Sequence, residues 1–298
     1  IMIELPDDFK RTIIGVHGIA GEKWLSHFDN LINYCISKWR FKLMPAKKLS
    51  YNFVAPVLFE DGSKAILKLG VPGTGVFSEI AALSVFNGSG FCKLLDAEPG
   101  KGIMLLEYIE PGEPLNMIRD EITSTKIVAS LIKDIRTVNP TTNHSFQTAD
   151  DWYNDLVDLH QRFGDIIPEP LYTNAIGAYQ SIKDSRQEQR LLHGDLHHEN
   201  ILSAGNDTWK AIDPKGIISE KACELIPYLM NDLEGKDIGT AISGRGNIFS
   251  EELNIPIKRI NQWGEFRSVL SVYWKTEDNM HITPEDLAIC KYFISNKP

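Results

Sequence analysis

The side chains best suited to chemistry lie in two short polar groups between residues 193 and 216. The first group contains Asp195 and Asn200, and the second begins at Asp213. A carboxylate such as that of Asp195 can orient an acceptor hydroxyl and take its proton. Asn200 and Asp213 supply an amide oxygen and a carboxylate, which are ligands that Mg²⁺ prefers. Magnesium-dependent phosphoryl transfer needs this combination of groups.

Short apolar stretches predict the strands that would position these groups. Apolar pairs at 191–192 and 201–202 border the first group. After a turn at 205–207, a second strand runs to Asp213. A hairpin of this kind would aim the three polar side chains at one point.

The rest of the chain divides into a strand-rich part and a helical part. Two hairpin patterns precede the breaker-rich segment 110–114, and helical periodicity dominates after it. We expect a lobe boundary there, with a β-rich lobe at 1–109, a mainly helical lobe at 110–298 and a ligand cleft between them. The expected strands are 50–59, 64–69, 91–97 and 102–108, and the expected helices are 22–40, 76–86, 121–138, 150–162, 169–184, 222–233, 250–262, 264–276 and 284–294.

The two polar groups resemble the catalytic loop and the metal-binding segment of protein-kinase-like enzymes, which read H-R-D followed by Asn, and then D-F-G. Here Gly194 stands where protein kinases have Arg, and His-Gly-Asp-Leu-His-x-x-Asn is similar to the aminoglycoside phosphotransferase family. The run Asp213-Pro214-Lys215-Gly216 resembles the streptomycin 6-kinase and hydroxyurea phosphotransferase branch. The resemblance implies an α+β, protein-kinase-like fold of two lobes.

The same resemblance implies ATP and Mg²⁺ as cofactors, with Asp195 as the base and Asn200 and Asp213 as metal ligands. His193 would support the loop. Lys215 could meet a phosphate or pair with a nearby acid.

In the N-terminal lobe the resemblance implies a lysine for the ATP phosphates. Lys68 lies in an apolar strand, and Glu79 in the next helix could pair with it. The stretch 46–54 would cover the phosphates, with Ser50 near them, but it has no glycine for a close backbone cradle. Glu107 and Ile109 fall on the linker strand whose backbone would meet adenine.

The acceptor is expected to be a small cationic molecule bound by acidic side chains of the helical lobe through charge-assisted hydrogen bonds. Streptomycin is the leading candidate and a hydroxyurea-type acceptor the next. The candidate residues are Asp150, Asp151, Asp155, Glu224 and Asp232.

Composition excludes several classes of protein. The chain has 298 residues and a formal net charge of -9, which argues against a nucleic-acid partner and is compatible with attracting a cationic substrate, although acidity also serves solubility alone. No apolar run is long enough for a membrane span. The four cysteines are scattered, which favours a reduced, cytoplasmic protein. A monomer or a homodimer fits these data.

Four alternatives stay open. The chain could phosphorylate choline, an amino sugar or an amino alcohol, or bind nucleotide without catalysis. A protein kinase is disfavoured because no A-P-E segment follows Asp213. The run from His193 to His198 reads H-x-D-x-H-H, which faintly resembles a metallohydrolase site.

Overall fold

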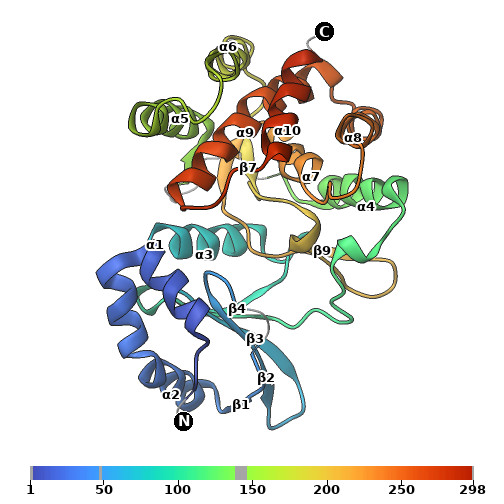
Figure 1. The fold of residues 1–298 in the computed structure, drawn as a ribbon. Coiled ribbons are helices and arrows are strands. Elements are labelled where there is room, and N and C mark those ends of the chain that lie inside the picture. Colours follow the sequence, from blue (N-terminus) through green and yellow to red (C-terminus); the bar gives the residue numbers. More distant parts are fainter. Residues whose placement is uncertain (1–2, 47–48, 138–145, 297–298) are drawn as a thin grey trace. The chain divides into compact units, whose positions relative to one another are not determined.

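The computed structural model describes residues 3–46, 49–137 and 146–296. The chain divides into two compact units, Ile1–Gly112 and Glu113–Pro298 (Figure 1). The division falls inside the breaker-rich segment 110–114. No helix formed by the described residues is both long and apolar enough to cross a membrane.

The first unit is built on a five-stranded antiparallel sheet with the order β1-β2-β3-β5-β4. Alternate residues of β3, such as Leu67 and Leu69, join a core that includes Trp24 of the first helix and Ile32 of the second. Since successive side chains of a strand point to opposite faces, Lys68 points to the other face. The elements are β1 (Phe41–Leu43), β2 (Phe53–Phe59), β3 (Lys64–Leu69), β4 (Leu94–Glu98), β5 (Ile103–Glu107), α1 (Asp7–Ser26), α2 (Phe28–Trp39) and α3 (Thr74–Phe86).

The predicted single helix over 22–40 is wrong. Helix α1 begins at Asp7 and ends at Ser26. The helical conformation is interrupted at His27, and α2 starts at Phe28. The apolar spacing continues through the break because Trp24 and Ile32 are buried in the same core. Both helices therefore contribute to one apolar stripe that the sequence pattern cannot divide.

The second unit is mainly helical, and α9 is its central element. Helix α9 packs against α5, α6, α8 and α10 (Figure 1). It buries Trp263, Phe266 and Tyr273. The helices are α4 (Glu121–Asp134), α5 (Ala149–Phe163), α6 (Glu169–Asp184), α7 (Ile226–Met230), α8 (Ile238–Leu253), α9 (Ile257–Glu277) and α10 (Pro284–Ser295).

Two small sheets complete the second unit. Strand β10 lies between β6 and β7, and β8 pairs with β9 in a hairpin. The strands are β6 (Gln147–Thr148), β7 (Arg190–Leu192), β8 (Ile201–Ser203), β9 (Trp209–Ala211) and β10 (Ile217–Ser219). This hairpin is the one predicted between the two polar groups.

The predicted helix over 250–262 is also wrong. Helix α8 ends at Leu253, and α9 begins at Ile257. Asn254 takes a left-handed conformation with φ of 53°, and its backbone N–H caps α8 through Ser250 O. Pro256 then precedes the first turn of α9. Asn at a helix C-terminus and Pro shortly after it are ordinary stop signals.

Candidate active site

A buried histidine joins the two polar groups. His193 Nε2 lies 2.7 Å from Ile212 O, and its Nδ1 accepts the backbone N–H of Asp195 at 3.1 Å. Burial lowers the pKa of His193 to about 4. The neutral ring with its proton on Nε2 satisfies both contacts. His193 therefore supports the loop, as the resemblance implies.

Glu224, a candidate for acceptor binding, is buried and accepts hydrogen bonds from the backbone of the loop. Its Oε2 accepts the backbone N–H of His193 at 2.7 Å, and its Oε1 accepts that of Gly194 at 3.0 Å. Burial raises the pKa of Glu224 to about 7, although the two N–H groups favour the charged form. Glu224 fixes the backbone that carries Asp195.

Asp195 lies between cationic side chains. Its Oδ2 is 3.2 Å from Lys215 Nζ. Burial by itself raises the pKa of Asp195, but Lys215, the nearby histidines and Arg267 outweigh burial and lower it. Asp195 is therefore a carboxylate at neutral pH, which is the form that can accept a proton from a hydroxyl.

Asn200 and Asp213 offer oxygen ligands of the type that magnesium needs. Asn200 Nδ2 donates to Asp195 O at 3.0 Å, so the loop uses the amide nitrogen and leaves the amide oxygen for a cation. The backbone N–H of Ile212 donates to Asn200 O at 2.9 Å, which places Asp213 just beyond the hairpin. Asp213 has a φ of 58°. Such conformations are uncommon outside glycine and cluster at functional sites.

The three histidines of the H-x-D-x-H-H run make separate contacts. His193 is bonded to Ile212, His197 Nε2 is 3.1 Å from Asn200 Nδ2, and His198 Nδ1 is 2.8 Å from Asn231 Oδ1. Each ring thus has its own structural partner. The geometry favours the kinase interpretation over the metallohydrolase one.

In the first unit, Lys68 and Glu79 form a buried ion pair. Lys68 Nζ lies 2.7 Å from Glu79 Oε1 and 2.9 Å from Oε2. Strand β3 directs Lys68 to the sheet face opposite the α1 and α2 core, and α3 supplies Glu79. Both side chains have most of their surface covered. The ammonium is therefore held in one place, as a phosphate-binding lysine requires.

The other nucleotide candidates lie in the same unit. Ser50 is exposed in the connection between β1 and β2, and Lys47 and Lys48 of that stretch lie outside the described residues. Glu107 closes β5, and its Oε2 accepts the backbone N–H of Lys93 at 2.9 Å. Ile109 is buried two residues later.

A pocket of about 230 Å³ opens beside Asp195 in the second unit. Its wall includes Lys215, Arg267, Trp274 and Lys275. Lys275 Nζ is 2.5 Å from Asp286 Oδ1. The pocket therefore combines the proposed base with cations that already have partners, and with an aromatic ring.

The acidic candidates of the sequence lie outside the residues that line this pocket. Asp150 pairs with Arg186 at 2.9 Å, and Asp151 Oδ2 caps α5 by accepting the backbone N–H of Thr148 at 2.7 Å. Asp155 is half-buried on α5, where burial and neighbouring acids raise its pKa.

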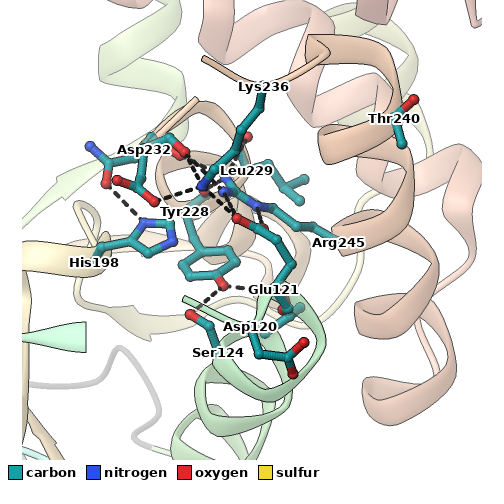
Figure 2. Close-up of polar contacts among 12 residues, drawn as sticks. Asp120, Glu121, Ser124, His198, Tyr228, Leu229, Asp232, Lys236, Thr240 and Arg245 are labelled. Carbon is teal, nitrogen blue, oxygen red and sulfur yellow. Dashed lines mark hydrogen bonds and ion pairs between the residues drawn. The ribbon is translucent and has the colours of Figure 1, made fainter. Parts of the chain in front are cut away.

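Asp232 belongs to a polar network around Arg245 (Figure 2). Lys236 Nζ lies 2.8 Å from Asp232 Oδ2 and 2.5 Å from Glu121 Oε1. The buried guanidinium of Arg245 donates to Glu121 Oε2 at 2.6 Å and to Asn231 O at 2.6 Å. Asp232 is thus occupied by internal ion pairing.

The same network reaches the catalytic loop. The ring of His198 stacks on Tyr228 with centroids 4.1 Å apart, and the Tyr228 hydroxyl contacts Ser124 at 2.9 Å (Figure 2). His198 begins the short 3-10 turn that ends at Asn200. Helices α4, α7 and α8 therefore support the turn that carries the proposed metal ligand.

Arg267 of α9 was not among the predicted site residues. Its guanidinium is buried 3.9 Å from the ring centroid of Trp152, and Nη2 donates to Gly194 O at 3.3 Å. Arginine side chains are usually exposed, so the sequence gives no sign that Arg267 is buried or that its charge reaches the loop.

The fold and this site define a small-molecule kinase of protein-kinase-like architecture. The chain belongs to the aminoglycoside/hydroxyurea antibiotic resistance kinase family, whose sequence model matches residues 44–279. A streptomycin 6-kinase of Streptomyces glaucescens is 25% identical over 285 residues, with 93% of this chain and 92% of the relative covered. A hydroxyurea phosphotransferase of Kitasatospora aureofaciens is 26% identical over 289 residues, with 95% and 84% covered.

Solved structures agree on the fold. The choline kinase LicA from Streptococcus pneumoniae, also solved with AMP, superposes with a TM-score of 0.66 at 14% identity. The superposition covers 90% of this chain and 98% of that protein. The predicted α+β kinase-like fold and the predicted family branch are confirmed.

Proposed function

We propose that this kinase transfers the γ-phosphoryl group of ATP to a hydroxyl of a small aminoglycoside-like or hydroxyurea-type acceptor. The observation that carries the proposal is the position of Asp195, a carboxylate held at a pocket by His193 and Glu224. The named relatives, which act on streptomycin and on hydroxyurea, support the choice of acceptor.

In the proposed reaction the Asp195 carboxylate accepts the proton of the acceptor hydroxyl. The acceptor oxygen forms a bond to the γ-phosphorus as the bond to the β–γ bridging oxygen breaks, and ADP leaves. Lys68, oriented by Glu79, is assigned to the ATP phosphates. We assign Ser50, Glu107 and Ile109 to nucleotide binding because of their positions in the first unit, after β1 and at the end of β5.

Asn200 and Asp213 are the proposed magnesium ligands, because together they offer an amide oxygen and a carboxylate on one hairpin. When bound, magnesium neutralises charge on the phosphates. The structure fits this role because the Asn200 amide nitrogen is held by Asp195 O, so the side chain is fixed with its oxygen free of that bond.

A cationic acceptor such as streptomycin is the first candidate. Asp155 has its pKa raised by burial first and then by Asp151, Glu277 and Asp158. A bound cation would relieve this repulsion. The pKa of Asp278 is also raised, first by burial and then by Glu277, and Lys215 partly offsets this increase.

The four cysteines are free and buried, which supports a reducing, cytoplasmic setting. Monomer and homodimer both agree with the proposal, and size-exclusion chromatography with light scattering separates them.

The test is ADP release coupled to acceptor, with Mg·ATP and a panel of streptomycin, hydroxyurea, choline and amino sugars. Acceptor-dependent release by the wild type that disappears in Asp195→Ala, with Mg·AMP-PNP binding retained, supports the proposal and names the acceptor. Release that persists in Asp195→Ala removes Asp195 as the base. Nucleotide binding without release for every acceptor overturns the proposed acceptor class.

A further inference from the structure

The catalytic loop has no room for the arginine that precedes the catalytic aspartate in protein kinases. Gly194 has a φ of +84°, a backbone conformation that residues other than glycine rarely adopt. A Cβ at this position would lie 2.8 Å from Ile217 Cγ2. Positive charge near Asp195 must therefore come from other parts of the chain.

Lys215, which belongs to the second polar group, supplies a positive charge next to Asp195. Its backbone N–H donates to His193 O at 2.8 Å, and that of Gly216 donates to the same oxygen at 3.1 Å. These bonds fasten the segment after Asp213 to the catalytic loop. The lysine side chain then reaches back to Asp195, with Nζ 3.2 Å from Oδ2.

Both partners of this ion pair are partly open to solvent. The side chain of Asp195 is 31% exposed and that of Lys215 is 54% exposed, so the ammonium can change partner without unfolding the loop. Lys215 Nζ also lies 5.5 Å from the ring centroid of Trp274, and both residues line the pocket. An ammonium paired only with the base would weaken that base, because an opposite charge favours the carboxylate.

We propose that Lys215 is a catalytic residue that binds Asp195 before reaction and the transferring phosphoryl group during it. The inference rests on the proposed function. The base must lie about 3 Å from the acceptor hydroxyl, whose oxygen attacks phosphorus from about 3–3.5 Å. An ammonium beside Asp195 is therefore within reach of the equatorial phosphoryl oxygens, where negative charge is stabilised in the transition state.

The bonds that form and break are those of the proposed transfer. The acceptor proton goes to Asp195, the acceptor oxygen bonds to phosphorus, and ADP leaves with the bridging oxygen. Lys215 contributes charge and hydrogen bonds and takes no part in the proton transfer. Its release from Asp195 on arrival of the phosphoryl group restores the strength of the base at the moment of transfer.

The test compares Lys215→Met, Lys215→Arg and, as a matched control, Lys210→Met on strand β9. For each variant we would measure kcat and KM with Mg·ATP and acceptor, and affinity for Mg·AMP-PNP. A second affinity measurement would use ADP with aluminium fluoride and acceptor, a mimic of the transferring phosphoryl group. A thermal melt of each variant checks the fold.

We expect Lys215→Met to lower kcat about 100-fold, the size of effect seen when one transition-state hydrogen-bond donor is removed. Its affinity for the aluminium fluoride complex should fall by a similar factor, with Mg·AMP-PNP affinity unchanged. Lys215→Arg should recover most of kcat, and Lys210→Met should match the wild type. If Lys215→Met melts early, recovery of kcat in Lys215→Ala by added ethylammonium supports the proposal, and no recovery contradicts it.

Three outcomes overturn the proposal. One is an unchanged kcat in Lys215→Met. Another is a loss of kcat with unchanged affinity for the aluminium fluoride complex, which would make Lys215 a positioning residue for Asp195 alone. The third is an equal loss of AMP-PNP affinity, which would make it a ground-state ligand. A wild type that transfers phosphoryl to no acceptor ends both proposals, whereas an active wild type with an active Lys215→Met ends only this one.

Discussion

Glu224 Oε2 accepts the backbone N–H of His193 at 2.7 Å, across a separation of 31 residues in the chain. The carboxylate uses its second oxygen for the N–H of Gly194. Two consecutive N–H groups of the catalytic loop thus converge on one buried side chain. Glutamine has one oxygen and one NH₂ group, so it can satisfy only one of them.

We therefore expect Glu224→Gln to destabilise the protein by about 1–3 kcal/mol, the cost of leaving a buried donor unsatisfied. Because the folded pKa of Glu224 is raised to about 7, its contribution to stability is fully present below the unfolded value and is lost as the pH rises to about 7. Chemical denaturation at pH 5 and pH 8 checks this. The wild type should lose more stability over this interval than Glu224→Gln, and equal losses would contradict the prediction.

The buried pair of Lys68 and Glu79 leads to a second prediction. Lys68→Met leaves the Glu79 carboxylate buried without its cation, so we expect a loss of about 3 kcal/mol in stability. Mg·AMP-PNP affinity should also fall, because Lys68 is assigned to the phosphates. In Lys68→Met/Glu79→Gln the stability should recover while the affinity stays low.

Thermal melts and calorimetric titration separate these two effects. Recovery of nucleotide affinity in the double variant would show that Lys68 serves the fold and not the phosphates. Lys64→Met is a suitable control, because Lys64 is exposed at the start of the same strand.

The sequence predicted some parts of the site and missed others for physical reasons. Asp195, Asn200 and Asp213 stand close together in the chain, so their spacing, with the apolar stretches and the turn between them, predicted one loop and one hairpin. The partner of Glu224 is backbone, and every residue type except proline provides an N–H, so no sequence pattern marks that contact. Arg267 reaches Gly194 O from 73 residues away, and only the packing of α9 brings the two together.

Helix boundaries show the same limit. The apolar stripe through Trp24 and Ile32 continues across the break at His27 because both helices face one core. Periodicity detects the buried face and not the hydrogen bonds that end a helix. By contrast, the end of α8 could have been predicted from the sequence, because Asn254 and Pro256 are ordinary helix stop signals.

A third prediction concerns Gly194. Alanine at a φ of +84° is strained by roughly 1–2 kcal/mol, and its Cβ would lie 2.8 Å from the methyl group of Ile217, which is buried in β10. We expect Gly194→Ala to lower the melting temperature by several degrees and to reduce kcat, because Asp195 follows directly. Gly177→Ala on α6 is the matched control, since a Cβ there meets nothing within 4 Å. A Gly194→Ala variant as stable and active as the wild type would contradict the steric argument.

The network in Figure 2 gives a fourth prediction. Arg245 is almost wholly buried and donates to Glu121 and to the backbone carbonyl of Asn231. Arg245→Met removes the donor of the Asn231 carbonyl and leaves Glu121 paired with Lys236 alone, so we expect a loss of about 3 kcal/mol in stability. Lys236→Met removes a more exposed partner of the same Glu121, and it should cost about 1 kcal/mol or less.

The effect should also extend to magnesium. Asn231 holds His198, and the turn that begins at His198 ends at Asn200. In Arg245→Met the backbone of Asn231 no longer has the hydrogen bond from Arg245, so Asn231 should hold His198 and the turn to Asn200 less firmly. We therefore expect a higher Mg²⁺ concentration at half-maximal activity when ATP is fixed. A magnesium titration of Arg245→Met and Lys236→Met at a temperature where both are folded measures this. If Arg245→Met is less stable but has an unchanged magnesium requirement, the network stabilises the fold without positioning Asn200.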